Sequence, residues 1–369
     1  MTPRLALILP ALILSSSRAQ EPAAAPAPRP VDLAICLDTS GSMTALIDAA
    51  RTRIWSIVNE LALADPAPRL RVALLAYGTP GFGPESGFVK VLTDFTEDLD
   101  AVSAHLFALA TNGGDEFVGR VLRHSLALDW SKEEGLKLVV VAGNESADQD
   151  REAPFRDECR FAIGRGILVN ALYCGPAGHT DAEGYREVAR LADGHFAAID
   201  PASAVNLVSP FDREIADLNA ALNRTNVPFG REGAAGAAAQ ERADSDASKS
   251  SSQTLAQRAQ AKSGALYWNR WCLLDALDRG TVKLEEMKEE DLPAALRGKS
   301  LEEQRSYLEA KRAERKKVQD HIQALSKQRA DWAEAEMKKQ RLSEEDSFDA
   351  AVKQAIRAQA AKKGYTFPE

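Results

Sequence analysis

The stretch Asp38-Thr39-Ser40-Gly41-Ser42-Met43, together with the apolar run Val31 to Leu37 before it, decides how this chain folds. A short apolar run that ends in turn residues predicts a buried β-strand. The turn that leaves this strand carries a carboxylate at Asp38 and hydroxyls at Ser40 and Ser42, at positions i, i+2 and i+4. Mg²⁺ prefers hard oxygen ligands and usually keeps several waters. The spacing therefore predicts part of a magnesium site, and the alternative is a plain polar turn whose hydroxyls cap the next helix.

The motif resembles the metal-ion-dependent adhesion site of the von Willebrand factor type A (VWA) family, whose signature is D-x-S-x-S directly after an apolar strand. The resemblance covers roughly residues 31–226. It implies that Asp38, Ser40 and Ser42 hold Mg²⁺ or Mn²⁺ with one position left open. A Glu or Asp side chain of a partner protein would complete the octahedron. The resemblance thus implies protein binding rather than catalysis.

Two later loops resemble the remaining metal loops of that family. The segment Thr111-Asn112-Gly113-Gly114-Asp115 is similar to the second loop, which usually reads Gly-Gly-Thr or Gly-Gly-Asp. The resemblance implies that Asp115 takes the customary threonine position, with Thr111 as the alternative if the register differs. Asn144 stands where the family ends its fourth strand in an aspartate. The formal charge of the site then stays at minus two, from Asp38 and Asp115. The alternative for Asn144 is a turn residue that caps the next helix.

Apolar runs alternate with amphipathic segments as far as residue 226, which predicts a doubly wound, mostly parallel α/β sheet flanked by helices. The expected strands are 31–37, 70–77, 88–92, 136–142, 167–173 and 195–199, and the expected helices lie near 46–61, 99–109, 117–128, 161–163, 185–191 and 204–222. The strand 88–92 should pair antiparallel with 70–77. In such sheets ligands bind beyond the carboxyl ends of strands, where the strand order reverses. Asp38 lies at such an end.

The first residues predict export. Arg4 precedes the apolar run Leu5 to Leu14, and Ser17 and Ala19 fit a small-x-small cleavage pattern. We expect a cleavable signal peptide over 1–19 and an Ala/Pro-rich spacer over 20–30. The apolar run is too short to span a bilayer, so we expect a periplasmic or secreted protein without a membrane span after cleavage. The alternative is an uncleaved N-terminal anchor.

The net charge and the catalytic motifs in the sequence limit the classes of function that we expect. The net charge of −8 argues against nucleic acid as a partner. The five histidines are scattered and form no H-E-x-x-H pattern, and neither a G-x-S-x-G elbow nor a P-loop is present. We therefore expect no enzymatic activity, with a metal-dependent hydrolase as a less favoured alternative. In an exported chain Cys159 and Cys174 could form a disulfide, and free buried thiols are the alternative.

The composition changes after residue 226. The segment 227–265 is rich in Gly, Ala, Ser and Asp, which predicts a flexible linker with a nascent helix at 253–262. Residues 266–369 should form a mainly helical region, with a long helix or helical hairpin over 301–342 and a last helix over 348–362. The long segment has weak coiled-coil character, so self-association through the C-terminal helices is an open alternative. A structural scaffold that acts through this tail, with a degenerate metal site, is the second function considered.

Overall fold

The sheet at the centre of the computed structural model has six strands in the order β3-β2-β1-β4-β5-β6. The structure describes residues 29–45, 47–199, 208–340 and 348–368, so the predicted signal peptide lies outside the described residues. The strands are β1 (Pro30–Asp38), β2 (Arg69–Tyr77), β3 (Val89–Thr96), β4 (Leu136–Gly143), β5 (Leu168–Tyr173) and β6 (Phe196–Ala198). Strand β3 runs antiparallel to β2 and the other pairs are parallel. The predicted fold class is confirmed.

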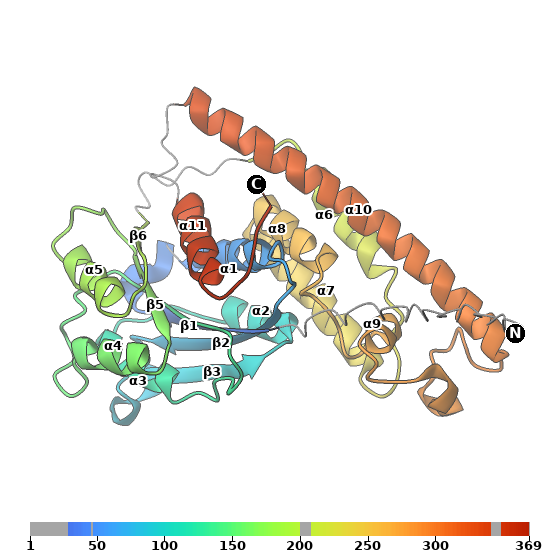
Figure 1. The fold of residues 1–369 in the computed structure, drawn as a ribbon, viewed down its shortest axis with the longest axis horizontal. Coiled ribbons are helices and arrows are strands. Elements are labelled where there is room, and N and C mark those ends of the chain that lie inside the picture. The colour runs from blue at the N-terminus through green and yellow to red at the C-terminus, as the bar shows by residue number, and fades with distance from the viewer. Residues whose placement is uncertain (1–28, 46, 200–207, 341–347, 369) are drawn as a thin grey trace, which may run out of the picture.

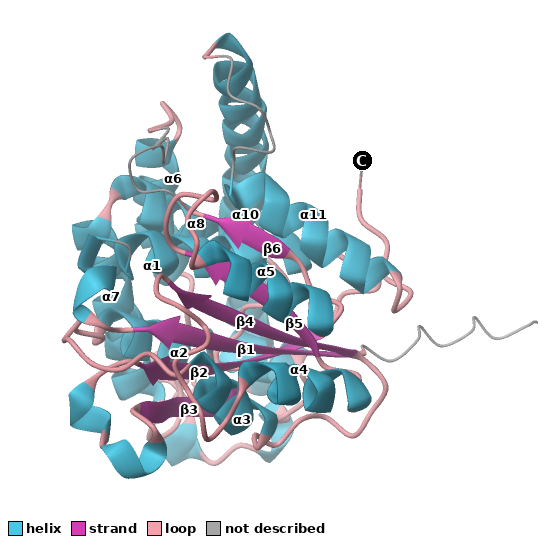
Figure 2. Ribbon diagram, turned by 90° about the vertical axis from the view of Figure 1, so that its left-hand side faces the viewer, coloured by secondary structure: helices cyan, strands magenta, loops and turns pink. Residues whose placement is uncertain are grey.

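Helices cover both faces of this sheet (Figure 2). One face packs against α1 (Ile47–Leu61), α2 (Leu99–Phe107) and α11 (Phe348–Ala361), and the other against α3 (Val118–Leu126), α4 (Phe155–Gly164) and α5 (Ala182–Leu191). In β1, Leu33 and Ile35 belong to the first core and Ala34 and Cys36 to the second. A strand buried on both faces must be apolar throughout, which explains the continuous run in the sequence.

The register places three strand ends side by side. Asp38 of β1 lies opposite Tyr77 of β2, and Leu37 lies opposite Ala142 of β4. The chain leaves β1 for β2 on one side and returns to β4 on the other, so the strand order reverses at β1. Ligands bind at such a point in open α/β sheets. Asp38 therefore stands at the predicted switch point.

The prediction of a flexible linker over 227–265 is wrong for residues 233–250, which are helical, whereas the nascent helix predicted at 253–262 matches a helix over 252–263. This segment forms α7 (Gly233–Ser250) and α8 (Ser252–Ser263), which join α6 (Asp212–Asn223) in a helical layer beside α1. Alanine is the strongest helix former, so the Ala-rich composition favours a helix here. Gly236 is required by packing, because a Cβ atom there would lie 2.3 Å from the Trp271 indole. The side chain of Ser251 accepts a hydrogen bond from the Thr254 amide and caps α8.

Residues 266–369 are mainly helical, as predicted, and their helices pack on two different parts of the molecule. After α9 (Leu273–Asp278), the single 39-residue helix α10 (Leu301–Lys339) crosses α6 and α8 (Figure 1). Helix α11 then packs on α1 and β6 of the sheet domain. Beyond it, Thr366 forms an antiparallel bridge with Asp65, and the Tyr365 hydroxyl donates a 3.0 Å hydrogen bond to the Arg29 carbonyl. The shorter 3₁₀ turns are η1 (Gly41–Ala45), η2 (Pro80–Phe82), η3 (Pro84–Ser86), η4 (Leu284–Glu286) and η5 (Glu289–Asp291).

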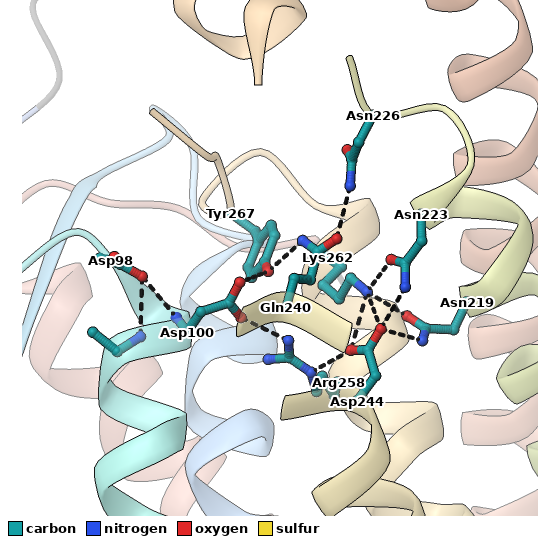
Figure 3. A network of polar contacts seen from close by, with 11 residues as sticks. Asp98, Asp100, Asn219, Asn223, Asn226, Gln240, Asp244, Arg258, Lys262 and Tyr267 are labelled. Atoms are coloured by element: carbon teal, nitrogen blue, oxygen red, sulfur yellow. Dashed lines mark hydrogen bonds and ion pairs between the residues drawn. The ribbon is translucent and has the colours of Figure 1, made fainter. Parts of the chain in front are cut away.

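A buried network of charges joins the helical layer to the sheet domain (Figure 3). The fully buried Arg258 of α8 contacts Asp100 of α2 through Nη2 and Asp244 of α7 through Nε, both at 2.6 Å. Lys262 Nζ lies 2.8 Å from Asp244, and the Tyr267 hydroxyl donates to Asp100 at 2.6 Å. Two cations thus balance two carboxylates. Burial raises the pKa of Asp244, but Lys262 and Arg258 outweigh it and lower that pKa to about 2.

The four cysteines are buried free thiols, so Cys159 and Cys174 are not joined. Burial raises the pKa of both Cys36 and Cys159, in the latter case to about 12, which keeps these thiols protonated and unreactive. Within the described part of the chain, no helix combines the length and apolar character needed to cross a membrane.

The substitution Arg258→Met should destabilise the whole protein. It leaves Asp100 and Asp244 short of a buried cation, which typically costs about 3–5 kcal/mol. Urea unfolding followed by circular dichroism measures this loss, and Arg242→Met, at an exposed position on α7, should change the unfolding free energy by no more than about 0.5 kcal/mol. Equal stability of the two variants would show that the network does not hold the helical layer in place.

Candidate metal centre

The turn after β1 is fixed by hydrogen bonds to its neighbour β2. The amide and hydroxyl of Thr39 both donate to the Tyr77 carbonyl, at 2.8 and 2.9 Å. The amide of Ser40 donates to Asp38 Oδ1 at 2.7 Å, which turns the chain back toward the carboxylate. Asp38, Thr39 and Ser40 are all buried. The carboxylate of Asp38, the last residue of β1, is thus buried within the turn rather than exposed to solvent.

The structure brings four of the predicted site residues together. Ser40 Oγ lies 2.8 Å from Ser42 Oγ, and Ser42 Oγ donates a 3.0 Å hydrogen bond to Asn144 Oδ1. Asn144 stands directly after β4, whose neighbour β1 ends at Asp38. Ser42 is exposed and Asn144 half-buried, so this flank of the site faces solvent.

The loop of residues 111–116, called here the glycine loop, also reaches the site, but in a different register from the one predicted. The Asn112 amide donates to the Thr39 carbonyl at 2.9 Å, which docks the loop on the turn. Asp115, the predicted ligand, is exposed, and the alternative Thr111 lies against the Thr44 hydroxyl at 2.7 Å. The residue that the structure turns inward is Glu116, which is 1% exposed.

Sequence reasoning missed Glu116, although a signal was present. Asp115 and Glu116 are adjacent acids in one loop, and neighbouring side chains of an extended backbone point to opposite sides. The pair of adjacent acids therefore offered Glu116 as well as Asp115 as a candidate for the inward-facing carboxyl group. The match to Gly-Gly-Asp favoured Asp115, whereas the packing of the loop selected Glu116.

Asp38 and Glu116 lie against the same wall, Gly78. A Cβ atom on Gly78 would lie 2.7 Å from Asp38 Oδ1 and 3.2 Å from Glu116 Cγ. Gly78 has φ +82°, a conformation that favours glycine. Gly114 packs closely against Gly78, because a Cβ atom added to Gly114 would lie 2.5 Å from the Gly78 carbonyl oxygen. The two glycines allow both carboxyl groups to share one small space.

Three carboxyl oxygens in this space lack a hydrogen-bond partner. They are Asp38 Oδ2 and both side-chain oxygens of Glu116, all buried. A buried carboxylate without a partner is strongly unfavourable, so the pair requires a cation or a proton. Burial raises the pKa of Asp38, and burial together with Asp38 raises that of Glu116 to about 9. Two adjacent buried carboxyl groups of this kind share a proton when no cation is present.

The donor set fits a hard divalent ion. Two carboxylates, two hydroxyls and one amide oxygen are all oxygen donors, the type that Mg²⁺ and Mn²⁺ prefer. In the portion of the chain that is described, no group of three or more His, Cys, Asp and Glu side chains could hold a metal. The centre would therefore depend on the hydroxyls of Ser40 and Ser42 as well as on the two acids. Such mixed ligands differ from the His and Cys ligands typical of zinc.

Three of the five histidine side chains have contacts away from this centre. His124 lies 3.1 Å from the Ser86 carbonyl, and His179 lies 3.0 Å from the Tyr173 hydroxyl. His321 lies beside Glu214. The geometry thus gives no specific support to the hydrolase alternative.

Comparisons with known proteins concern the fold. No family model and no curated protein matches this sequence. A von Willebrand factor type A structure from Catenulispora acidiphila is 19% identical, with a TM-score of 0.39, over 47% of this chain and 40% of that chain. The vWF domain of the type V pili tip protein Mfa5 from Porphyromonas gingivalis is 14% identical, with a TM-score of 0.36, over 48% and 91%. Proximal thread matrix protein 1 from the mussel byssus, with a zinc-occupied MIDAS motif, is 13% identical, with a TM-score of 0.39, over 47% and 42%.

The matched region is just under half of this chain, and this chain spans less than half of two of those proteins. At these identities the function has to come from the residues of the site itself.

The stability of the metal-free protein should depend on pH through Glu116. Between its ordinary pKa of 4.5 and its folded value of about 9, the folded state keeps a proton that the unfolded chain releases. The folded state then binds more protons, so the free energy of unfolding falls as pH rises through this window. Glu116→Gln removes this contribution and should make the metal-free protein more stable at pH 8 by roughly 1–3 kcal/mol.

Denaturant unfolding in EDTA at pH 5 to 9 measures this difference. The control is Asp115→Asn, which removes a charge from the same loop at an exposed position and should follow the parent protein. Parallel pH profiles for the parent and Glu116→Gln would contradict the placement of Glu116.

Proposed function

We propose that this chain is an exported protein-binding module that holds Mg²⁺ or Mn²⁺ at the carboxyl end of its sheet and binds an acidic side chain of a partner protein through that ion. The observation that carries the proposal is the pair of buried acids, Asp38 and Glu116, which lie against Gly78 and have three carboxyl oxygens without a hydrogen-bond partner. A bound cation would satisfy all three. Asn144, which replaces the customary aspartate, would support the site through Ser42.

Protein binding is favoured because one flank of the site is open. Asp38 and Glu116 approach from the interior, whereas Ser42 is exposed and Asn144 half-buried. When bound, the ion would supply an electrophilic centre that attracts an anionic oxygen from this flank. The chain's own residues would hold the ion, and the open side would be left to water or to a partner.

Two loops border the open flank and would set specificity. The segment 78–87 is ordered by η2 and η3, and the Ser86 hydroxyl donates to the carbonyls of Phe82 and Gly83 at 2.8 and 3.0 Å. The segment 146–153 is held by Asp150, which accepts from the amides of Glu152 and Ala153. Recognition residues are commonly found on loops that a rigid scaffold positions.

A structural scaffold with a metal-free site is the second candidate. It is supported by the burial of the pair, because a proton shared between Asp38 and Glu116 could satisfy the two carboxyl groups without an ion. The long helix α10 would then carry the interactions, and self-association through it is part of this alternative. Export, which rests on the signal-peptide prediction for residues 1–19, is common to both candidates.

Calorimetric titration with Mg²⁺ and Mn²⁺ separates the two candidates. We expect binding that weakens by more than about tenfold in Asp38→Asn, since even indirect ligand partners typically contribute 10–100-fold. Asp115→Asn should bind as the parent protein does. Buffers of different ionisation enthalpy should reveal close to one proton released per ion at pH 7, because the ion displaces the shared proton.

Absence of Mg²⁺ and Mn²⁺ binding by the parent protein at pH 8 would overturn the metal-dependent proposal and favour the scaffold. Equal loss of binding in Asp38→Asn and Asp115→Asn would instead restore Asp115 as the second acidic ligand.

A further inference from the structure

We infer that Glu116 is a built-in carboxylate that strengthens the hold on the ion and weakens the capture of a partner's carboxylate. This inference rests on the proposed function and concerns the regulation of the same site. The acid in the glycine loop would then set how strongly the loaded site attracts an external acid. The partner affinity of the chain would be limited by one of its own side chains.

The geometry fixes Glu116 inside the site rather than at its rim. Its amide donates to Gln149 Oε1 at 3.3 Å, and Gln149 Nε2 donates to Glu145 Oε2 at 3.2 Å. Its carbonyl accepts from the Val118 amide at 3.1 Å, at the start of α3. Both flanks of the residue are therefore anchored, one on the loop after β4 and the other on a helix. The backbone of Glu116 is thus held on both sides, with its side chain buried.

The walls of the site keep the acid close to Asp38. Gly78 and Gly114 pack so tightly that an added Cβ atom on Gly114 would lie 2.5 Å from the Gly78 carbonyl oxygen and 2.7 Å from Pro80 Cδ. A Cβ atom added to Gly78 would lie 3.2 Å from Glu116 Cγ as well as 2.7 Å from Asp38 Oδ1, and neither carboxyl oxygen of Glu116 has a hydrogen-bond partner. An ion next to Asp38 would therefore meet a second fixed negative charge on its buried side.

The charge of Glu116 should strengthen the binding of the ion and weaken the binding of an external carboxylate. With Asp38 alone, a divalent ion keeps one unit of net positive charge, whereas with Asp38 and Glu116 it keeps none. A unit charge that lies close to a partially buried group interacts with it far more strongly than in water. Removal of the Glu116 charge should therefore weaken ion binding and, once the site is loaded, strengthen the binding of an external carboxylate. A residue that only supported the fold would not produce this reversal.

The test uses Mn²⁺ as the ion and acetate as the simplest external carboxylate. The relaxation rate of water protons reports bound Mn²⁺. Acetate that binds to the ion replaces water there and therefore lowers this relaxation rate. We expect Glu116→Gln, which is isosteric and neutral, to bind Mn²⁺ about tenfold or more weakly and, at saturating Mn²⁺, to bind acetate about tenfold or more tightly. Asp115→Asn, which removes the exposed charge next to it, should leave both affinities unchanged.

Glu116→Thr provides a second variant, because it removes the charge and also shortens the side chain. It should show the same reversed pair of shifts, and thermal unfolding confirms that each variant is folded. Unchanged or weaker acetate binding by both folded variants, with Mn²⁺ still bound by the parent, overturns this inference and leaves the proposed function standing. Absence of Mn²⁺ binding in the parent protein overturns both.

Discussion

Two carboxyl groups confined at the end of one buried strand are the constraint on which the rest of the site depends. Asp38 arrives on β1 and Glu116 on the glycine loop, and neither has enough partners among the surrounding donors. Their repulsion must be relieved by a positive charge, either a proton or a cation. The close glycines Gly78 and Gly114, and the hydroxyls of Ser40 and Ser42, then have one common purpose. In the proposed function they would let a small cation approach both acids while one side stays open.

A second set of buried charges joins the remainder of the chain to this site. Helix α2 begins beside Asp100, which pairs with Arg258 and Tyr267 of the helical layer, and it ends just before the loop that carries Glu116. One short helix therefore contacts the helical layer at its start and leads to the loop that carries Glu116 at its end. Here the charges balance without an ion, because Arg258 and Lys262 face Asp100 and Asp244. The buried charges of the helical layer are thus paired with opposite charges, whereas the carboxyl groups of Asp38 and Glu116 have no such partner.

Local patterns in the sequence were sufficient for the strands and for most of the site. The apolar runs located every strand to within a few residues, except that β3 continues to Thr96, and they placed Asp38, Ser40, Ser42 and Asn144 at one edge of the sheet. The inward direction of Glu116 could not be predicted, because it depends on how the loop packs against Gly78. The helix α7 was mistaken for a linker because its Gly/Ala composition fits both, and only the indole of Trp271 explains Gly236. The return of α11 to the sheet domain leaves no local signal, since it depends on contacts such as that of Arg357 with Glu60, which lies about 300 positions away.

The pairing of the two ends of the described chain gives the molecule a polarity. Tyr365 and Thr366 contact Arg29 and Asp65, which lie where β1 and β2 begin, whereas Asp38 closes β1 at the opposite edge. A nine-residue strand separates these edges by roughly 25–30 Å. If the protein is tethered to a surface through either of these ends, the edge of the sheet that carries Asp38 points away from that surface. A fluorophore or a bead could be attached at the same place without blocking access to the site.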